Sequence, residues 1–218
     1  MTSTPNGLRP LVRHTGRTVP LRRGNVDTDQ IMPAEFCKRV TKSGFEDAVF
    51  SRWRAEPDFV LERPERAGAS VLLAGPDFGT GSSREHAVWG LRDWGFVAVL
   101  SSRFGDIFRR NALKNQLLAV VLPEPAIETL TTASERDPSM EVTIDVAAGT
   151  VEGGGGSWEF DLDGRTRWLL LNGYDDIAVT LREADAITAY ETSRPYWLPS
   201  IRPDDGAAAR DRTPQEAT

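Results

Sequence analysis

The sequence predicts an α/β protein in which helices cover a parallel or mixed sheet. In the middle of the chain, short apolar runs of strand length alternate with longer segments whose apolar residues recur at helical spacing. Gly and Pro stand at the ends of several of these segments, where they commonly end helices and strands. Strands that alternate with helices of this length are joined by crossover connections, and such connections build parallel or mixed sheets.

Three short apolar runs predict buried strands. Each run is bounded by Gly, Pro or polar residues, and none has the polar alternation of a strand with one solvated face. The runs are Ser70–Ala74, Phe96–Leu100 and Gln116–Leu122.

Two amphipathic helices are expected between these strands. Ser83–Trp94 places Ala87, Val88 and Leu91 on one helical face, and Gly95 then ends the helix. A second helix is expected from about Phe104 to Ala112, because its apolar residues again recur every three to four positions.

The rest of the chain predicts smaller elements. Pro125–Thr132 is expected to be a short helix with proline in its first turn. Glu141–Val146 and Trp158–Asp161 are expected to be strands that flank a hairpin tip at Gly153–Gly156. Thr180–Glu191 is expected to be a final helix, since its first residues fit a capping box.

The chain is expected to form one domain over residues 11–201. Residues 1–10 look like a flexible lead, and residues 202–218 are polar and non-periodic, which predicts a disordered tail. The sequence shows no internal repeat at a fixed period.

Composition excludes several classes of protein. The formal net charge of -6 argues against a nucleic-acid partner, because phosphate neutralisation needs a basic face. Cys37 is the single cysteine, so neither an intramolecular disulfide nor a centre held by several thiolates can form within this chain. With no signal-like or membrane-spanning apolar run, we expect a cytoplasmic protein that does not enter the membrane.

The most informative segment is Gly75–His86, which lies between a predicted strand and a predicted helix. Ligands of open α/β sheets bind outside the carboxyl ends of strands, where such loops lie. Gly75, Gly79 and Gly81 let the backbone adopt positive φ and approach a ligand closely.

Three polar residues of this loop predict an anion site. Ser82 and Ser83 stand at the expected helix start, where unpaired N–H groups favour negative charge, and Arg84 offers a planar fork to a carboxylate. A purely structural interpretation is also open: Ser82 and Glu85 fit a capping box.

A second polar cluster lies within Arg23–Phe36. It contains Asp27 and Asp29, two positions apart, just before an apolar stretch. The structural interpretation is an Asx-type turn that leads into a strand or short helix. The functional interpretation is a carboxylate that orients a hydroxyl or an arginine of an active site.

Taken together, the segments Gly24–Pro33 and Gly75–His86 resemble the small subunit of 3-isopropylmalate dehydratase, an aconitase relative. The two motifs occur in the family's order and separation, and Trp197–Pro199 looks like a further family feature. The resemblance covers about residues 11–200.

This resemblance implies a fold, a partner and a reaction. The fold is the three-layer β/β/α swivelling domain that resembles the C-terminal domain of aconitase. The chain itself holds no cofactor or metal; a large subunit carries a 4Fe-4S cluster and pairs with the small one as a heterodimer or heterotetramer. The pair interconverts 2-isopropylmalate and 3-isopropylmalate through 2-isopropylmaleate in leucine biosynthesis.

The resemblance also implies roles for individual residues. Ser82 corresponds to the serine that acts as base, and Ser83 helps to form an oxyanion environment. Arg84 holds a substrate carboxylate, and Asp29 organises Arg84 or the serines. The residues implied to contact the substrate are Thr28, Phe36, Cys37, Gly81 and Arg84.

The exact diacid is left open by the segment after Pro33. Phe36 and Cys37 are expected to line an apolar pocket for an isopropyl group, with Val40 behind them. Lys38-Arg39 would instead reach an anionic substituent. The alternative substrates are homoaconitate, citraconate and a methylated malate.

Two further alternatives come from other classes of function. One is a non-catalytic regulatory module, since some aconitase relatives bind RNA. The other is a dehydratase that works alone without iron and sulfur. The segment from Thr28 to about Arg54 is expected to be mobile until substrate and partner arrive, and His86 is expected to be a packed helix residue.

Overall fold

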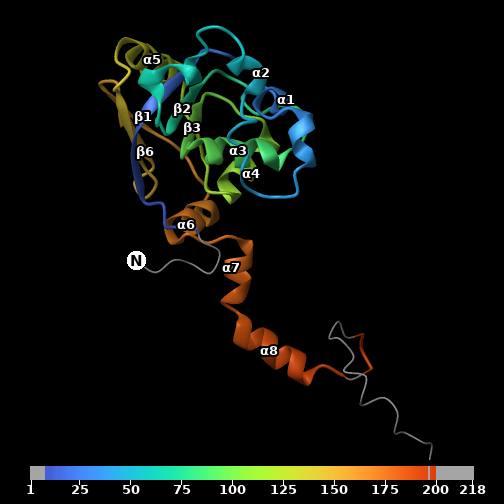
Figure 1. Cartoon of the computed structure of the whole chain (residues 1–218). Coiled ribbons are helices and arrows are strands. Elements are labelled where there is room, and N and C mark those ends of the chain that lie inside the picture. Colours follow the sequence, from blue (N-terminus) through green and yellow to red (C-terminus); the bar gives the residue numbers. More distant parts are fainter. Residues whose placement is uncertain (1–7, 196, 200–218) are drawn as a thin grey trace, which may run out of the picture. The chain divides into compact units, whose positions relative to one another are not determined.

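The computed structural model describes residues 8–195 and 197–199, and its sheet has seven strands in the order β4-β3-β2-β1-β5-β6-β7 (Figure 1). Neighbours among β1 to β4 are parallel, and β5, β6 and β7 continue the sheet beyond β1 as antiparallel strands. The strands are β1 (Arg13–Leu21), β2 (Val71–Ala74), β3 (Ala98–Ser101), β4 (Leu118–Val121), β5 (Glu141–Asp145), β6 (Thr150–Gly153) and β7 (Gly156–Glu159).

Helices pack on this curled sheet, so the predicted α/β fold with a parallel or mixed sheet is confirmed. The α-helices are α1 (Thr28–Ile31), α2 (Ser51–Arg54), α3 (Glu85–Trp94), α4 (Asp106–Lys114), α5 (Glu124–Arg136), α6 (Gly164–Asn172), α7 (Asp176–Leu181) and α8 (Ala184–Ser193). Short 3-10 helices cover Ala34–Lys38, Val60–Glu62 and Pro64–Arg66.

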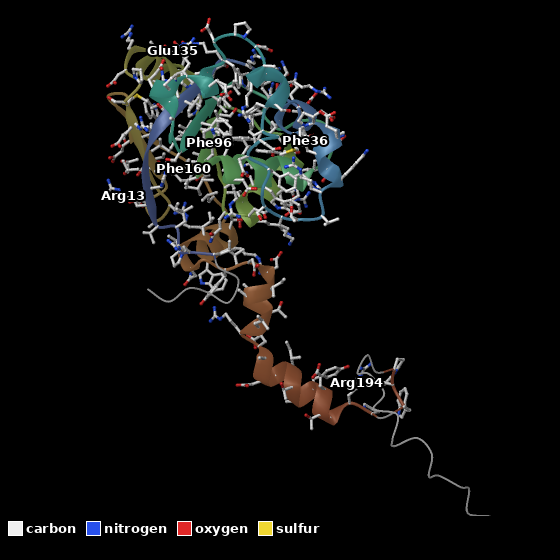
Figure 2. The ribbon with its side chains drawn as sticks, in the orientation of Figure 1. Arg13, Phe36, Phe96, Glu135, Phe160 and Arg194 are labelled. Atoms are coloured by element: carbon white, nitrogen blue, oxygen red, sulfur yellow. The ribbon has the colours of Figure 1, made fainter. Side chains whose placement is uncertain are left out.

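The parallel strands bury both of their faces, because successive side chains of a strand point to opposite sides. One apolar cluster contains Leu72 and Val99 and packs against α3, α4 and the segment of residues 26–61. The other contains Val71 and Leu73 and packs against α5 and β5–β6. α3 and α4 therefore lie on the side of α1 and α2, and α5 with β6 on the other (Figure 1). Phe36 packs on the first cluster, and Phe160 belongs to the second (Figure 2).

The three predicted buried strands and the stop at Gly95 are confirmed, with strand ends shifted by at most two residues. Gly95 ends α3 in a left-handed conformation with φ 111°. α5 is longer than predicted, extending to Arg136, because its buried face continues to Ser134. The elements that were not predicted include β1, β6 and α6: β1 begins with polar, partly exposed residues, β6 is a short strand of mixed burial, and α6 buries only Leu170.

The final helix predicted over Thr180–Glu191 is present as α8, but it begins at Ala184, so the predicted start at Thr180 is wrong. α7 and α8 are separate helices, and Thr180 lies inside α7 instead of capping a helix start. Glu183 is the residue before α8, and its side chain makes no capping hydrogen bond. The matching capping-box residues are therefore present in the sequence but lie in another local conformation.

The described chain divides into two compact units, one ending at Val179 and the other beginning at Thr180. The division predicted from the sequence, one domain over residues 11–201, stays a prediction. Residues 1–7 of the predicted lead and the predicted tail of residues 202–218 lie outside the described residues. None of the described helices has the length and apolarity needed to cross a membrane.

The loop after β2 packs tightly against the start of α4. Gly79 has φ +76°, and a Cβ placed on it would lie 2.2 Å from Cγ of Phe108. A Cβ on Gly105 would lie 2.4 Å from the carbonyl oxygen of Gly79. Neither position therefore has room for a side chain, and the positive φ of Gly79 favours glycine as well.

We expect Gly79→Ala to destabilise the fold by roughly 2–5 kcal/mol, because left-handed backbone strain and overpacking against Phe108 add together. The matched control is Gly155→Ala. Gly155 has φ +81°, but no atom lies within 4 Å of the added Cβ. Strain alone predicts a loss of roughly 1–2 kcal/mol there. Urea unfolding of both variants measures the difference, and equal losses would contradict the crowding argument.

Candidate functional site

The candidate site lies where the loops after β1 and β2 meet at the carboxyl edge of the parallel strands. The N–H of Asn25 donates to the carbonyl of Pro76 at 2.8 Å, and that of Gly79 donates to the carbonyl of Val26 at 2.7 Å. The N–H of Thr28 donates to the carbonyl of Thr80 at 2.9 Å. These bonds fix the two predicted motifs side by side, although about fifty residues separate them.

Asp27 begins the short helix α1. Its Oδ1 accepts from the N–H of Gln30 at 2.8 Å, and the side-chain oxygen of Gln30 accepts from the N–H of Asp27 at 2.8 Å. This reciprocal pair is a capping box. The structural interpretation of the first acid of the motif is therefore confirmed.

Asp29 points to the other motif, where it forms an ion pair with Arg84. This hydrogen bond holds the pKa of the Arg84 guanidinium above its ordinary value. The side chains of Arg84 and Asp29 are 23% and 44% exposed, so the pair remains open to a ligand from solvent. Arg84 thus presents a fixed positive charge at this edge.

Ser82 and Ser83 are exposed and lie in the loop, ahead of the helix. α3 begins at Glu85 with Arg84 as its first flanking residue, so the expected helix start at Ser83 is wrong by two residues. No side chain caps this end of α3, which rules out the capping box of Ser82 and Glu85. Glu85 instead accepts a hydrogen bond from the side-chain amide of Asn115 at 2.6 Å.

Gly81 and Thr28 fix the backbone of the segment that carries Ser82 and Ser83. Gly81 has φ +85°, as predicted, whereas Gly75 lies outside the positive-φ region. Thr28 is 2% exposed, and its hydroxyl donates to the carbonyl oxygen of Ser82 at 2.9 Å.

The predicted apolar pocket residues lie in the 3-10 helix Ala34–Lys38. Phe36 and Cys37 are half-buried and pack on the first apolar cluster, and Cys37 is a free thiol. Arg39 lies over the ring of Phe36 at 5.0 Å and forms an ion pair with Asp47 at 2.7 Å. Val40 is 99% exposed, so the expectation that it lies behind the pocket is wrong.

One loop at this edge was missed by the sequence reasoning. The segment after β3 donates from Gly105 N–H to the carbonyl of Phe78 at 2.9 Å, and Phe78 N–H donates to the carbonyl of Arg103 at 3.1 Å. Arg103 also forms an ion pair with Asp77. The available signal was the position of this segment directly after a predicted parallel strand.

His86 packs against aromatic rings, as expected for a helix residue. Its ring centroid lies 4.8 Å from that of Trp89 and 5.5 Å from that of Phe45. Among the residues that the structure describes, no group of three or more His, Cys, Asp and Glu side chains is arranged to hold a metal ion.

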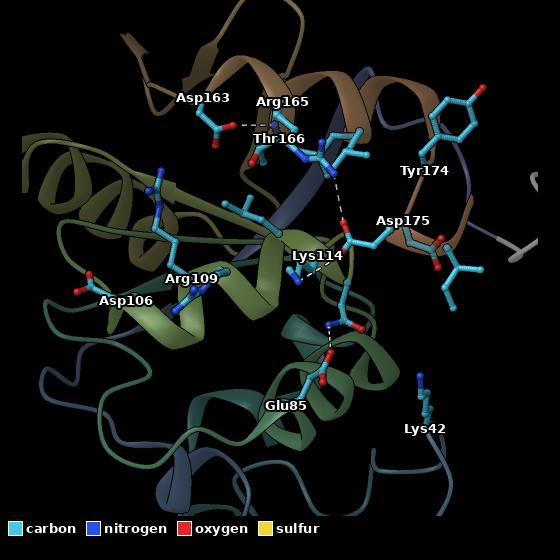
Figure 3. Close-up of a pocket in the computed structure, with 17 residues that line it drawn as sticks. Lys42, Glu85, Asp106, Arg109, Lys114, Asp163, Arg165, Thr166, Tyr174 and Asp175 are labelled. Atoms are coloured by element: carbon cyan, nitrogen blue, oxygen red, sulfur yellow. Dashed lines mark hydrogen bonds and ion pairs between the residues drawn. The ribbon is translucent and has the colours of Figure 1, made fainter. Parts of the chain in front are cut away.

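A cleft of about 670 Å³ lies elsewhere, between α4, α6 and residues 174–177 (Figure 3). Arg109, Lys114 and Asp163 are among its lining residues, and Lys114 pairs with Asp176 at 3.1 Å. Its lining includes none of the predicted site residues. The cleft is therefore not the site that the two motifs form.

The chain is similar to known proteins in both sequence and fold. Residues 8–125 match the model of the aconitase C-terminal domain. The 3-isopropylmalate dehydratase small subunit of Acidothermus cellulolyticus is 58% identical over 195 residues, which are 89% of this chain and 99% of that protein. The chain belongs to the family of 3-isopropylmalate dehydratase small subunits.

Further matches agree with this family. The small subunit from a Parafrankia species is 60% identical over 187 residues, covering 86% of this chain and 96% of that protein. Residues 176–199 match the model of the C-terminal domain of these small subunits. The crystal structure of 3-isopropylmalate dehydratase (leuD) from Methanocaldococcus jannaschii has the same fold, with a TM-score of 0.60 and 23% identity over 82% of this chain and 99% of that one.

The two acids of the first motif should differ in their effect on stability. Asp27→Ala removes the cap of α1 and should lower the free energy of unfolding by about 1 kcal/mol. Asp29→Asn removes a partly exposed ion pair and should cost less than about 1 kcal/mol. Urea unfolding compares them, and a larger loss for Asp29→Asn would contradict the assigned contacts.

Proposed function

We propose that this chain is the small subunit of a two-chain hydro-lyase that interconverts 2-isopropylmalate and 3-isopropylmalate through 2-isopropylmaleate. Family membership at 58–60% identity over nearly the full length of the relatives is the observation that carries the proposal. The joined edge of the two motifs supports it, because a hydroxyl pair and an arginine stand together there. The pathway that this reaction serves is leucine biosynthesis.

The reaction requires a proton to leave a carbon next to a carboxylate, and negative charge then gathers on that carboxylate. We assign Arg84 to hold the carboxylate, since a guanidinium binds its two oxygens in a planar fork. Asp29 orients Arg84 through their ion pair. Ser82 is the proposed base, and Ser83 contributes to the stabilisation of negative charge.

Gly81, Phe36 and Cys37 are proposed to shape the substrate pocket. Gly81 keeps the serine loop free of a side chain, and the two others offer an apolar surface for an isopropyl group. Arg39 is already paired with Asp47, which favours an apolar substituent over an anionic one at this place.

The iron–sulfur cluster and the rest of the active site are proposed to reside in the large subunit. A 4Fe-4S cluster needs several thiolates, and this chain contains only Cys37. When bound to the partner, the cluster supplies a Lewis acid for the departing hydroxyl. Ser82 and Ser83 are exposed in this chain, which fits a site that a second polypeptide completes and shields from water.

Reconstitution tests the proposed function. The chain would be co-expressed with a cluster-bearing large subunit, and 2-isopropylmaleate would be followed by its absorbance. We expect turnover by the pair and none by either chain alone. Turnover of homoaconitate or citraconate without turnover of isopropylmalate would reject the substrate, and activity of the lone chain would reject the division between subunits.

In the assembled enzyme, Ser82→Ala should lower kcat by at least roughly 100-fold, because positioned proton transfer contributes on that scale. Stability should stay within about 0.5 kcal/mol, since Ser82 caps no helix. Ser157→Ala, another exposed serine of this chain, is the control and should leave both properties unchanged. Full activity of Ser82→Ala would remove Ser82 from the mechanism.

A further inference from the structure

We infer that the hydroxyl of Thr28 is a positioning group that sets the peptide between Ser82 and Ser83, so that the N–H of Ser83 faces the substrate. The inference rests on the proposed function and deepens it. It gives Thr28 an indirect role, in place of the direct substrate contact that the family resemblance implies.

Thr28 is held on several sides. Its side chain is 2% exposed, its N–H donates to Thr80 at 2.9 Å, and its carbonyl accepts from the N–H of Met32 at 2.9 Å. The capping box of Asp27 and Gln30 fixes the same turn. The hydroxyl is therefore a donor at a fixed place, and its acceptor is the carbonyl oxygen of Ser82 at 2.9 Å.

Because a peptide group is planar, a hydrogen bond to the carbonyl of Ser82 also fixes the direction of the N–H of Ser83. In a trans peptide the C=O of Ser82 and the N–H of Ser83 belong to one rigid plane and point in opposite directions. Because Thr28 draws the carbonyl toward the buried side, the N–H of Ser83 is turned toward the exposed side.

The N–H of Ser83 is available for a ligand there. Within the part of the chain that the structure describes, this N–H donates to no protein acceptor. Ser83 is itself exposed and adjoins Arg84, which the proposed function assigns to the substrate carboxylate. A backbone donor beside that arginine is suited to the charge that develops when the proton leaves.

The test compares Thr28→Val, which keeps the shape but removes the hydroxyl, with Thr28→Ser, which keeps the hydroxyl. In the assembled enzyme, Thr28→Val should lower kcat roughly 10- to 100-fold, since removing one oxyanion-hole donor costs about 10²–10³ and displacing one costs less. KM should change less than kcat, because the charge that the donor stabilises develops in the transition state. Thr28→Ser should restore most of kcat.

Thr18→Val is the matched control. Thr18 lies on strand β1 and is 0% exposed, and its hydroxyl donates to the hydroxyl of Ser134 in α5 at 2.7 Å. It should lower Tm while kcat stays near the wild-type value. If Thr28→Val fails to fold, Thr28→Ala removes the same hydroxyl without inserting a second apolar branch.

Two results would overturn the inference while wild-type turnover persists: kcat within twofold of wild type in the variants that lack the hydroxyl, or a loss in Thr28→Ser as large as in Thr28→Val. Absence of turnover in the wild-type pair would instead reject the proposed function.

Discussion

The candidate site depends on the backbone hydrogen bonds that join the loop after β1 to the loop after β2. Asp29 and Arg84 are 55 residues apart in sequence. They meet because backbone hydrogen bonds of Val26 and Thr28 to the second loop hold the two loops together. Backbone N–H and C=O groups away from water need partners, so each loop supplies what the other lacks. The charge pair is thus a consequence of a backbone arrangement, and not the reason for it.

The layered core explains why the site lies at the edge of the sheet. Both faces of β2, β3 and β4 are covered, one by α3 and α4 and the other by α5 with the antiparallel strands. A ligand therefore cannot reach a face of the parallel sheet. The carboxyl edge, where β1, β2 and β3 pass into loops, offers exposed polar side chains next to backbone donors.

The sequence predicted the parts of the fold whose signal is local. Buried strands such as Val71–Ala74 are unbroken apolar runs, and Gly95 adopts the left-handed conformation that ends a helix. β6 and α6 carry no such signal, because each has a single buried residue and so shows neither an apolar run nor a clear periodicity. The helix break before Ala184 was hidden by a capping-box sequence, Thr180–Glu183, that begins inside α7 and ends just before α8. The pairing of Asp29 with Arg84 could be anticipated only from the family resemblance, because local spacing did not distinguish Asp29 from Asp27.

The five residues from Val26 to Gln30 show why this motif is a continuous block. Val26 accepts hydrogen bonds from the N–H groups of Gly79 and Thr80, Asp27 and Gln30 cap α1, and Thr28 binds the serine loop. Asp29 forms the ion pair with Arg84. Four residues of the block thus hold the loops in place, and the fifth, Asp29, pairs with Arg84. All of these contacts fix the same turn of the backbone. A substitution at any of the four residues therefore shifts Asp29 and Ser82 through the backbone, even where that residue does not contact a substrate.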